Sequence, residues 1–147
     1  MTIARTKILL LAFFLLTILF SRNILAISVT VNNENEISKV FQLFENGIKI
    51  GAVKEFSDLL YYETYISLEN GVSSYFSSNQ SFYILEEYLA TYKPVSFKLI
   101  KVSLSEDKPY AIGRFIYSKN GIKGESQVFV SLKLYNSHWK IFQITIN

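Results

Sequence analysis

Apolar residues recur with a helical period in three stretches of the N-terminal half of the chain. The first stretch places four of them at positions i, i+3, i+4 and i+7: Ile37, Val40, Phe41 and Phe44. Residues 33–36 supply an amide cap and acidic groups ahead of this stretch, and Asn46-Gly47 follows it. The pattern predicts a capped amphipathic helix that ends at Asn46-Gly47.

Two further helices are expected after the first. The second is short and has its apolar positions at Val53, Phe56, Leu59 and Leu60. The third follows the cluster Ser77-Ser78-Asn79, which can cap it, and it is closed by Pro94. Its apolar positions recur at i, i+3, i+7 and i+10: Phe82, Leu85, Leu89 and Tyr92. All three helices are predicted to turn an apolar face toward a common core.

The remaining segments have the composition of strands. Residues 61–68 are rich in aromatic and β-branched residues, and Asn70-Gly71 separates them from residues 72–76, which predicts a hairpin. After Pro94 come four extended runs with short links: 95–104, 110–117, 122–135 and 139–146. These four runs are expected to form an antiparallel meander. Helices that precede strands, without β-α-β alternation, indicate an α+β domain with three helices packed on one face of a curved antiparallel sheet.

Residues 1–26 have the profile of a secretory signal peptide. Arg5 and Lys7 precede the uncharged run 8–20, and Ala26 offers a small residue for cleavage. The run is shorter than the roughly 20 apolar residues that a membrane span needs. Retention as an uncleaved anchor is therefore the weaker alternative, and contact with the membrane is expected only through this segment before cleavage. We expect cleavage after Ala26 and one mature domain of residues 27–147.

Charge and composition exclude several classes of function. Of the 15 Lys and Arg residues, three lie in residues 1–26, and the twelve others match the 12 Asp and Glu residues, so the mature domain is neutral. A nucleic-acid-binding domain would need a clustered basic face, so no nucleic acid is expected as a partner. The chain has no Cys and one His, which argues against a disulfide framework, thiolate chemistry and a zinc site. We expect neither a metal nor a cofactor.

Few residues suggest catalysis. His138 is the single histidine and stands at a predicted turn, where a solvated imidazole is the default. Glu63 lies among tyrosines, where burial could raise its pKa toward that of a general acid or base. Strand alternation instead places Glu63 with Tyr61 on the face opposite the apolar one. That apolar face is predicted to consist of Leu60, Tyr62, Thr64, Ile66 and Leu68.

The high aromatic content suggests that some rings line a cavity. Helical aromatics such as Phe44 and Phe56 are expected in the core. Aromatic residues on strands are candidates for a pocket wall between helices and sheet: Tyr62, Phe97, Tyr110 and Trp139. Arg114 lies among apolar neighbours in a predicted strand and can either extend to water or bind an anion there.

Several sequence blocks resemble a known family. They include Tyr75 to Gln80, the run Ile84 to Tyr88, Tyr110 to Gly113, and the closing Ile141 to Ile146. Together these blocks resemble the small exported bacterial proteins of domain-of-unknown-function family 4783, over nearly all of the mature chain. The resemblance implies the nuclear-transport-factor-2-like (cystatin-like) fold, a cone of three helices against a strongly curved sheet. It implies no catalytic residue, and fold alone does not confer function.

Two hypotheses follow. The first is a non-catalytic exported binding or interaction domain in the periplasm or on the outer surface of a Gram-negative bacterium. Its cone would hold a small apolar ligand or a protein partner. The alternative is a proton-transfer enzyme of isomerase or dehydratase type, with Glu63 or Asp58 as base and a tyrosine as oxyanion donor. A homodimer formed by sheet-to-sheet packing is compatible with either hypothesis.

Overall fold

The computed structural model describes residues 33–147, and residues 35–147 form one compact unit. The predicted signal peptide, residues 1–26, lies outside the described residues. Within the described part of the chain, no helix is both long enough and apolar enough to cross a membrane.

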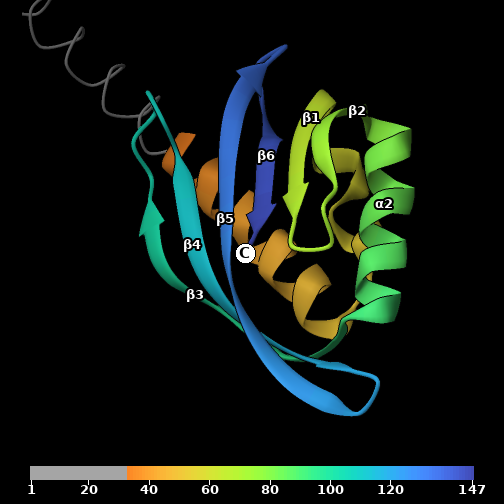
Figure 1. Cartoon of the computed structure of the whole chain (residues 1–147). Coiled ribbons are helices and arrows are strands. Elements are labelled where there is room, and N and C mark those ends of the chain that lie inside the picture. Colours follow the sequence, from red (N-terminus) through yellow and green to blue (C-terminus); the bar gives the residue numbers. More distant parts are fainter. Residues whose placement is uncertain (1–32) are drawn as a thin grey trace, which may run out of the picture. The chain divides into compact units, whose positions relative to one another are not determined.

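A six-stranded sheet forms the body of the unit (Figure 1). The strands are β1 (Leu60–Leu68), β2 (Ser73–Ser77), β3 (Lys93–Ser103), β4 (Tyr110–Lys119), β5 (Ile122–Tyr135) and β6 (His138–Ile146). Their spatial order is β2-β1-β6-β5-β4-β3. The predicted hairpin and the predicted four-stranded meander are both confirmed, because each consecutive pair is antiparallel. The sheet is not wholly antiparallel, since β6 returns beside β1 in the parallel direction.

Residues 33–50 are helical, so the first predicted helix is present and longer than expected. Residues 33–36 belong to it and do not precede it as a cap. The predicted end at Asn46-Gly47 is wrong. The helix ends at Gly51, whose positive φ of 69° allows the Ala52 amide to donate to the Gly47 carbonyl at 2.8 Å. Gly47 stays inside the helix because the Phe56 ring packs on it, in space that a Cβ atom would occupy.

The second predicted helix is replaced by two short 3-10 turns, η1 (Val53–Glu55) and η2 (Ser57–Leu59). Phe56 lies between them with φ −129°, which is outside the helical range and prevents one continuous helix. The two apolar residues that suggested a helix, Val53 and Phe56, are nevertheless buried. The described residues therefore contain two α-helices, and the prediction of three was wrong.

The last predicted helix is α2 (Ser78–Thr91), and its predicted cap is confirmed. The Gln80 amide donates to Ser77 Oγ at 3.3 Å, and the Ser77 amide donates to Gln80 Oε1 at 3.0 Å. This reciprocal pair is a capping box. Pro94 lies just beyond the helix, at the second position of β3.

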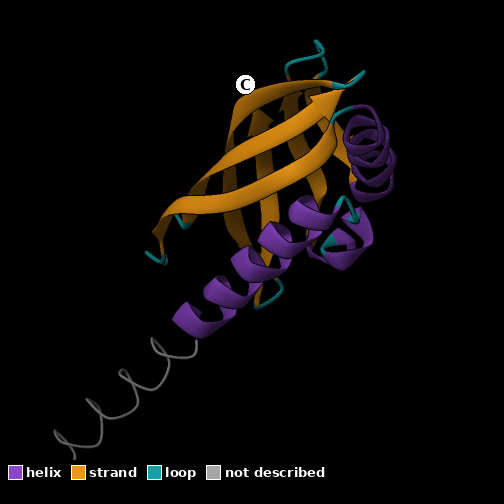
Figure 2. Cartoon of the chain, turned by 90° about the horizontal axis from the view of Figure 1, so that it is seen from below, coloured by secondary structure: helices purple, strands orange, loops and turns teal. Residues whose placement is uncertain are grey.

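Both α-helices lie on one side of the sheet (Figure 2). The core lies between the helices and the sheet, and residues of the helices and of every strand except β2 form it. Its largest buried side chains include Phe41, Phe44, Phe56, Phe115 and Tyr88. The sheet is twisted, but it is not rolled into the strongly curved cone that was expected. Register shifts interrupt three of its ladders, whereas the long β4–β5 ladder has none.

A large bulge in β1 interrupts the alternation of buried and exposed residues. Between the pairs Leu60–Ile141 and Tyr65–Gln143, β1 contains three more residues than β6. The Thr64 hydroxyl is buried in the bulge, within 3.1 Å of the Tyr61 carbonyl and 3.2 Å of the Ile141 carbonyl. The predicted alternation fails here, because Tyr61 is buried and Tyr62 is 53% exposed. Tyr62 therefore does not belong to the apolar face on which it was predicted.

Candidate ligand-binding face

Side chains fill most of the space between the helices and the sheet, apart from a groove of about 370 Å³ between the first helix and β3. Phe97 and Trp139 were candidates for a pocket wall on this side, and they are 4% and 3% exposed. The Phe97 ring packs edge-to-face against Phe44 and Phe115, with centroids 6.0 and 6.3 Å apart. Such contacts are those of a packed core. Phe97 and Trp139 therefore belong to the core and not to a pocket wall.

The opposite face of the sheet is covered by no helix of the described chain, and we name it the helix-free face (Figure 2). The strand register aligns one row of side chains across it: Tyr110, Ser131, Gln143, Tyr65 and Tyr75. The neighbouring residues Ala111, Val130, Ile144 and Ile66 are fully buried on the helix side. This alternation shows that the row belongs to the helix-free face.

Aromatic rings meet where β1, β5 and β6 converge. Tyr61 contacts three rings, those of Tyr62, Tyr135 and Phe142, with centroids 4.3, 5.2 and 5.7 Å away. The Lys133 Nζ lies 5.4 Å from the Tyr61 ring and 5.0 Å from the Phe142 ring, within the range of a cation–π interaction. We name these four rings the tyrosine cluster. Tyr62 thus belongs to an aromatic cluster in which Tyr62 and Tyr135 are exposed and Tyr61 is buried.

An apolar pocket of about 570 Å³ adjoins the tyrosine cluster, and we name it the β4–β6 pocket. It is lined by Asp107, Lys108, Pro109, Tyr110, Phe129, Ser131, Leu132, Lys133 and Phe142. The rings of Tyr110 and Phe129 stack with centroids 5.8 Å apart. The loop before β4 reaches across to β5, where the Leu132 amide donates to the Pro109 carbonyl at 2.9 Å. This volume lies in the usual range for small-molecule sites.

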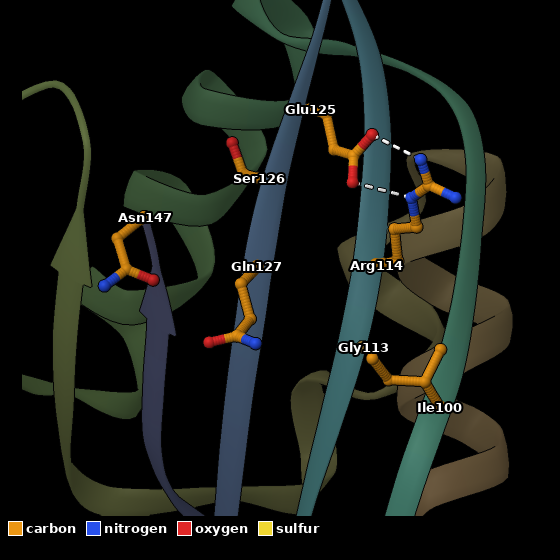
Figure 3. A pocket seen from close by; sticks show the side chains of 7 residues that line it. All are labelled: Ile100, Gly113, Arg114, Glu125, Ser126, Gln127 and Asn147. Carbon is orange, nitrogen blue, oxygen red and sulfur yellow. Dashed lines mark hydrogen bonds and ion pairs between the residues drawn. The ribbon is translucent and has the colours of Figure 1, made fainter.

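Arg114 lies on another part of the same face (Figure 3), beside a pocket of about 370 Å³. Its guanidinium forms two hydrogen bonds of 2.6 Å to the Glu125 carboxylate from the neighbouring strand. These bonds raise the pKa of Arg114 and lower the pKa of Glu125. Gln127 and Asn147 line the same pocket nearby (Figure 3). Because Glu125 offsets its charge, the Arg114 guanidinium attracts an external anion less strongly than an unpaired cation would.

The sequence interpretation did not single out Glu69, which the fold places beside a buried tyrosine. The Tyr88 hydroxyl donates to Glu69 Oε1 at 2.8 Å, and the Ser126 hydroxyl donates to the same oxygen at 3.1 Å. Burial, followed by the hydrogen bond to Glu69, raises the pKa of Tyr88 well above its usual value near 10. Tyr88 therefore stays protonated and acts as a neutral donor. A neighbouring pocket at Tyr88 measures only about 130 Å³.

The three residues considered for catalysis lie apart from one another. Glu63 is exposed on β1, opposite Ser77 of β2. Asp58 is exposed in η2, where its backbone carbonyl accepts a hydrogen bond from Lys140. His138 is exposed at the start of β6, with Nδ1 3.4 Å from Glu36 Oε1. The described structure thus does not bring these three side chains into one site.

The five candidate pocket residues are likewise divided. Phe97 and Trp139 are in the core, Tyr110 lines the β4–β6 pocket, Tyr62 joins the tyrosine cluster, and Arg114 pairs with Glu125. Sequence reasoning missed Phe129, Phe142 and Lys133, which surround the pocket with Tyr110. Alternation along residues 122–135 could have indicated Phe129 and Lys133, since both stand out of phase with buried Val128, Val130 and Leu132.

Comparison with known proteins supports the fold and the family. No curated protein matches the sequence. The chain is similar in structure to a DUF4783 family protein from Bacteroides uniformis, with a TM-score of 0.66 and 16% identity over 72% of this chain and 94% of that chain. A DUF4783 family protein from Bacteroides ovatus gives a TM-score of 0.62 and 18% identity over 71% and 90%.

A third structure extends the likeness beyond that family. It is an NTF-2 like protein of unknown function from Shewanella oneidensis, with a TM-score of 0.53 and 12% identity over 76% of this chain and 96% of that chain. At these identities the likenesses show an α+β nuclear-transport-factor-2-like fold and nothing of activity. The family model described as Domain of unknown function (DUF4783) matches residues 41–147. The chain therefore belongs to the DUF4783 family.

Proposed function

We propose that this protein is an exported, non-catalytic binding domain whose helix-free face holds a small apolar ligand. The observation that carries the proposal is the β4–β6 pocket, where the stacked rings of Tyr110 and Phe129 and the ring of Phe142 line about 570 Å³ of open space. On the helix side the core occupies most of the space, and the groove between the first helix and β3 is smaller, at about 370 Å³, with three polar lining residues, Ser38, Gln42 and Glu45. Apolar walls with a few polar groups at the rim are typical of ligand sites.

The proposed cellular location rests on the sequence of residues 1–26. The charged start, the uncharged run and Ala26 support export by cleavage of a signal peptide. The periplasm or outer surface of a Gram-negative bacterium is the proposed location. In that setting the ligand is a small apolar molecule or an apolar part of a protein partner.

Ligand retention in the protein's own host tests the proposal. The full chain is produced there, and the exported protein is examined by native mass spectrometry. We expect Tyr110→Ala and Phe129→Ala to lose a bound mass that the unaltered protein retains. Tyr83→Ala is the matched control, because Tyr83 is an exposed aromatic residue on α2. Equal retention by the pocket variants and the control would overturn the proposal. Trp139→Ala is unsuitable as a pocket variant, because Trp139 is a core residue.

The enzymatic alternative is now best represented by Glu69 and Tyr88, a carboxylate that accepts a hydrogen bond from a tyrosine. Two features favour a structural role for this pair. Glu69 Oε1 already accepts from Tyr88 and from Ser126, and the neighbouring pocket is too small for most substrates. The two variants can be compared by whether each replaces the unaltered protein in its host. A stably folded Glu69→Gln variant that fails to do so, while Phe129→Ala succeeds, would favour a proton-transfer enzyme.

A homodimer that buries part of the helix-free face is a further proposal compatible with ligand binding. The exposed rings of Tyr62, Tyr75 and Tyr135 would supply apolar area for such a contact. Light scattering after size-exclusion chromatography measures the oligomeric state. A dimer that Tyr75→Ala dissociates would support this contact, and a monomer at all concentrations would contradict it.

A further inference from the structure

We propose that the ligand of the β4–β6 pocket has an apolar body and an anionic group, and that Lys108 and Lys133 bind the anion at the pocket rim. The inference rests on the proposed function and names the chemical class of its ligand. The apolar body would lie against Tyr110, Phe129 and Phe142, which supply most of the wall.

Positive charge is concentrated at the rim. Lys108 and Lys133 both line the pocket, against a single acidic lining residue, Asp107. A third ammonium group, that of Lys101, lies 5.6 Å from the centroid of the Tyr110 ring, which itself lines the pocket. The rim therefore carries net positive charge although the mature domain as a whole is neutral.

These ammonium groups lack carboxylate partners in the part of the chain that the structure describes, where the ion pairs are Arg114–Glu125 and His138–Glu36. The Lys133 ammonium lies over the rings of Phe142 and Tyr61, at 5.0 and 5.4 Å. These contacts hold its charge beside the pocket. The Arg114 guanidinium, whose charge Glu125 offsets, would attract an anion less strongly than these ammonium groups. An ammonium that contacts only rings remains available to a carboxylate, phosphate or sulfate group.

Three probes with the same eight-carbon chain separate the contributions of charge and apolar surface: octanoate, octan-1-ol and octyltrimethylammonium. Their dissociation constants for the exported, processed protein are measured by calorimetry or by NMR titration. At about 20 mM salt we expect octanoate to bind roughly 5- to 10-fold more tightly than octan-1-ol, and the cation to bind most weakly. At about 500 mM salt the difference should shrink, because salt screens exposed charges.

Substitutions locate the effect. Lys133→Gln and Lys108→Gln should each lower the ratio of octanoate to octan-1-ol affinity, while octan-1-ol binding stays unchanged. Lys123→Gln is the matched control, because it removes the same charge from an exposed position near the other end of β5. Phe129→Ala should weaken the binding of all three probes.

The outcomes separate this inference from the proposed function. Equal affinity for octanoate and octan-1-ol, both weakened by Phe129→Ala, would overturn the anionic ligand and leave the binding pocket in place. The same holds if Lys123→Gln lowers the affinity ratio as much as Lys133→Gln does. Absence of binding by any probe, or binding that Phe129→Ala does not alter, would overturn both proposals.

Discussion

Phe44 and Phe56 join the first helix, the 3-10 turns and the sheet. Both are fully buried, and their rings meet edge-to-face with centroids 5.1 Å apart. Truncation of either to Ala should cost about 3–5 kcal/mol of unfolding free energy, because it removes a buried ring and leaves a cavity. Urea denaturation measures the loss. Tyr83→Ala, at an exposed position, should change stability far less. Urea midpoints that are the same for all three variants would contradict this view of the core.

Tyr88 should affect stability at alkaline pH. Below about pH 10 the folded and unfolded states both keep its proton. Above that value the unfolded chain loses the proton while the folded protein keeps it, so the unfolding free energy falls by up to about 1.4 kcal/mol per pH unit. Tyr88→Phe should therefore show a shallower decline between about pH 10 and 12 than the unaltered protein, whereas Tyr83→Phe should not. The same slope in both variants would contradict the raised pKa.

At this scale the sequence predicted some burial correctly and some wrongly. The helical period placed Phe44 and Phe56 in the core, and both are there. The strand period predicted a buried Tyr62 and an exposed Tyr61, and the structure reverses their burial, because Tyr61 is covered by the other rings of the tyrosine cluster. Buried and exposed residues alternate only in a regular strand ladder. No local sequence pattern indicated the bulge between Leu60 and Tyr65. The contact of Glu69 with Tyr88 joins distant segments and had no signal in the local sequence.

Among the elements, α2 depends on its capping box. Ser77→Ala removes the acceptor for the Gln80 amide and should cost about 1 kcal/mol of unfolding free energy. Ser78→Ala is the matched control, because it removes a neighbouring exposed hydroxyl outside the cap. Thermal or urea denaturation of both variants checks the effect. A larger loss of stability for Ser78→Ala than for Ser77→Ala would contradict the assigned cap.

Element positions were more predictable than element type. All six strands lie within a few residues of their predicted runs, because turn residues such as Asn70-Gly71 and Asn120-Gly121 mark the hairpins. The segment after Gly51 has a helix-like apolar spacing but forms two 3-10 turns. A spacing of three residues between Val53 and Phe56 suits either structure, so periodicity alone could not decide between them.

At the scale of the whole molecule, the proposed signal peptide predicts where the exported protein begins. Cleavage after Ala26 should leave a protein of residues 27–147, because the uncharged run 8–20 is bounded by basic residues and followed by a small residue. Mass spectrometry of the protein from its own host measures this directly. A mass that includes residues 8–20 would favour an uncleaved anchor.

The proposed binding face could not be predicted from the sequence. Of the candidate pocket residues only Tyr110 lines the β4–β6 pocket, because the pocket was predicted between the helices and the sheet and this one lies on the opposite face. The core fills most of the space between the helices and the sheet. The pocket depends on the loop before β4, whose Pro109 carbonyl accepts a hydrogen bond from the Leu132 amide, and on the bulge at Phe142 in β6. Both features exist only in the folded sheet.

The most direct test of the central claim is chemical-shift mapping of the mature protein with octanoate. If the helix-free face is the binding surface, the largest amide shifts should lie at Tyr110, Phe129 and Lys133, around the pocket that these residues line. The amide chemical shifts of α2, including that of the buried Tyr88, should stay unchanged, because α2 lies on the helix side of the sheet. Shifts concentrated at Glu69 and Tyr88, with none at Phe129, would contradict the account.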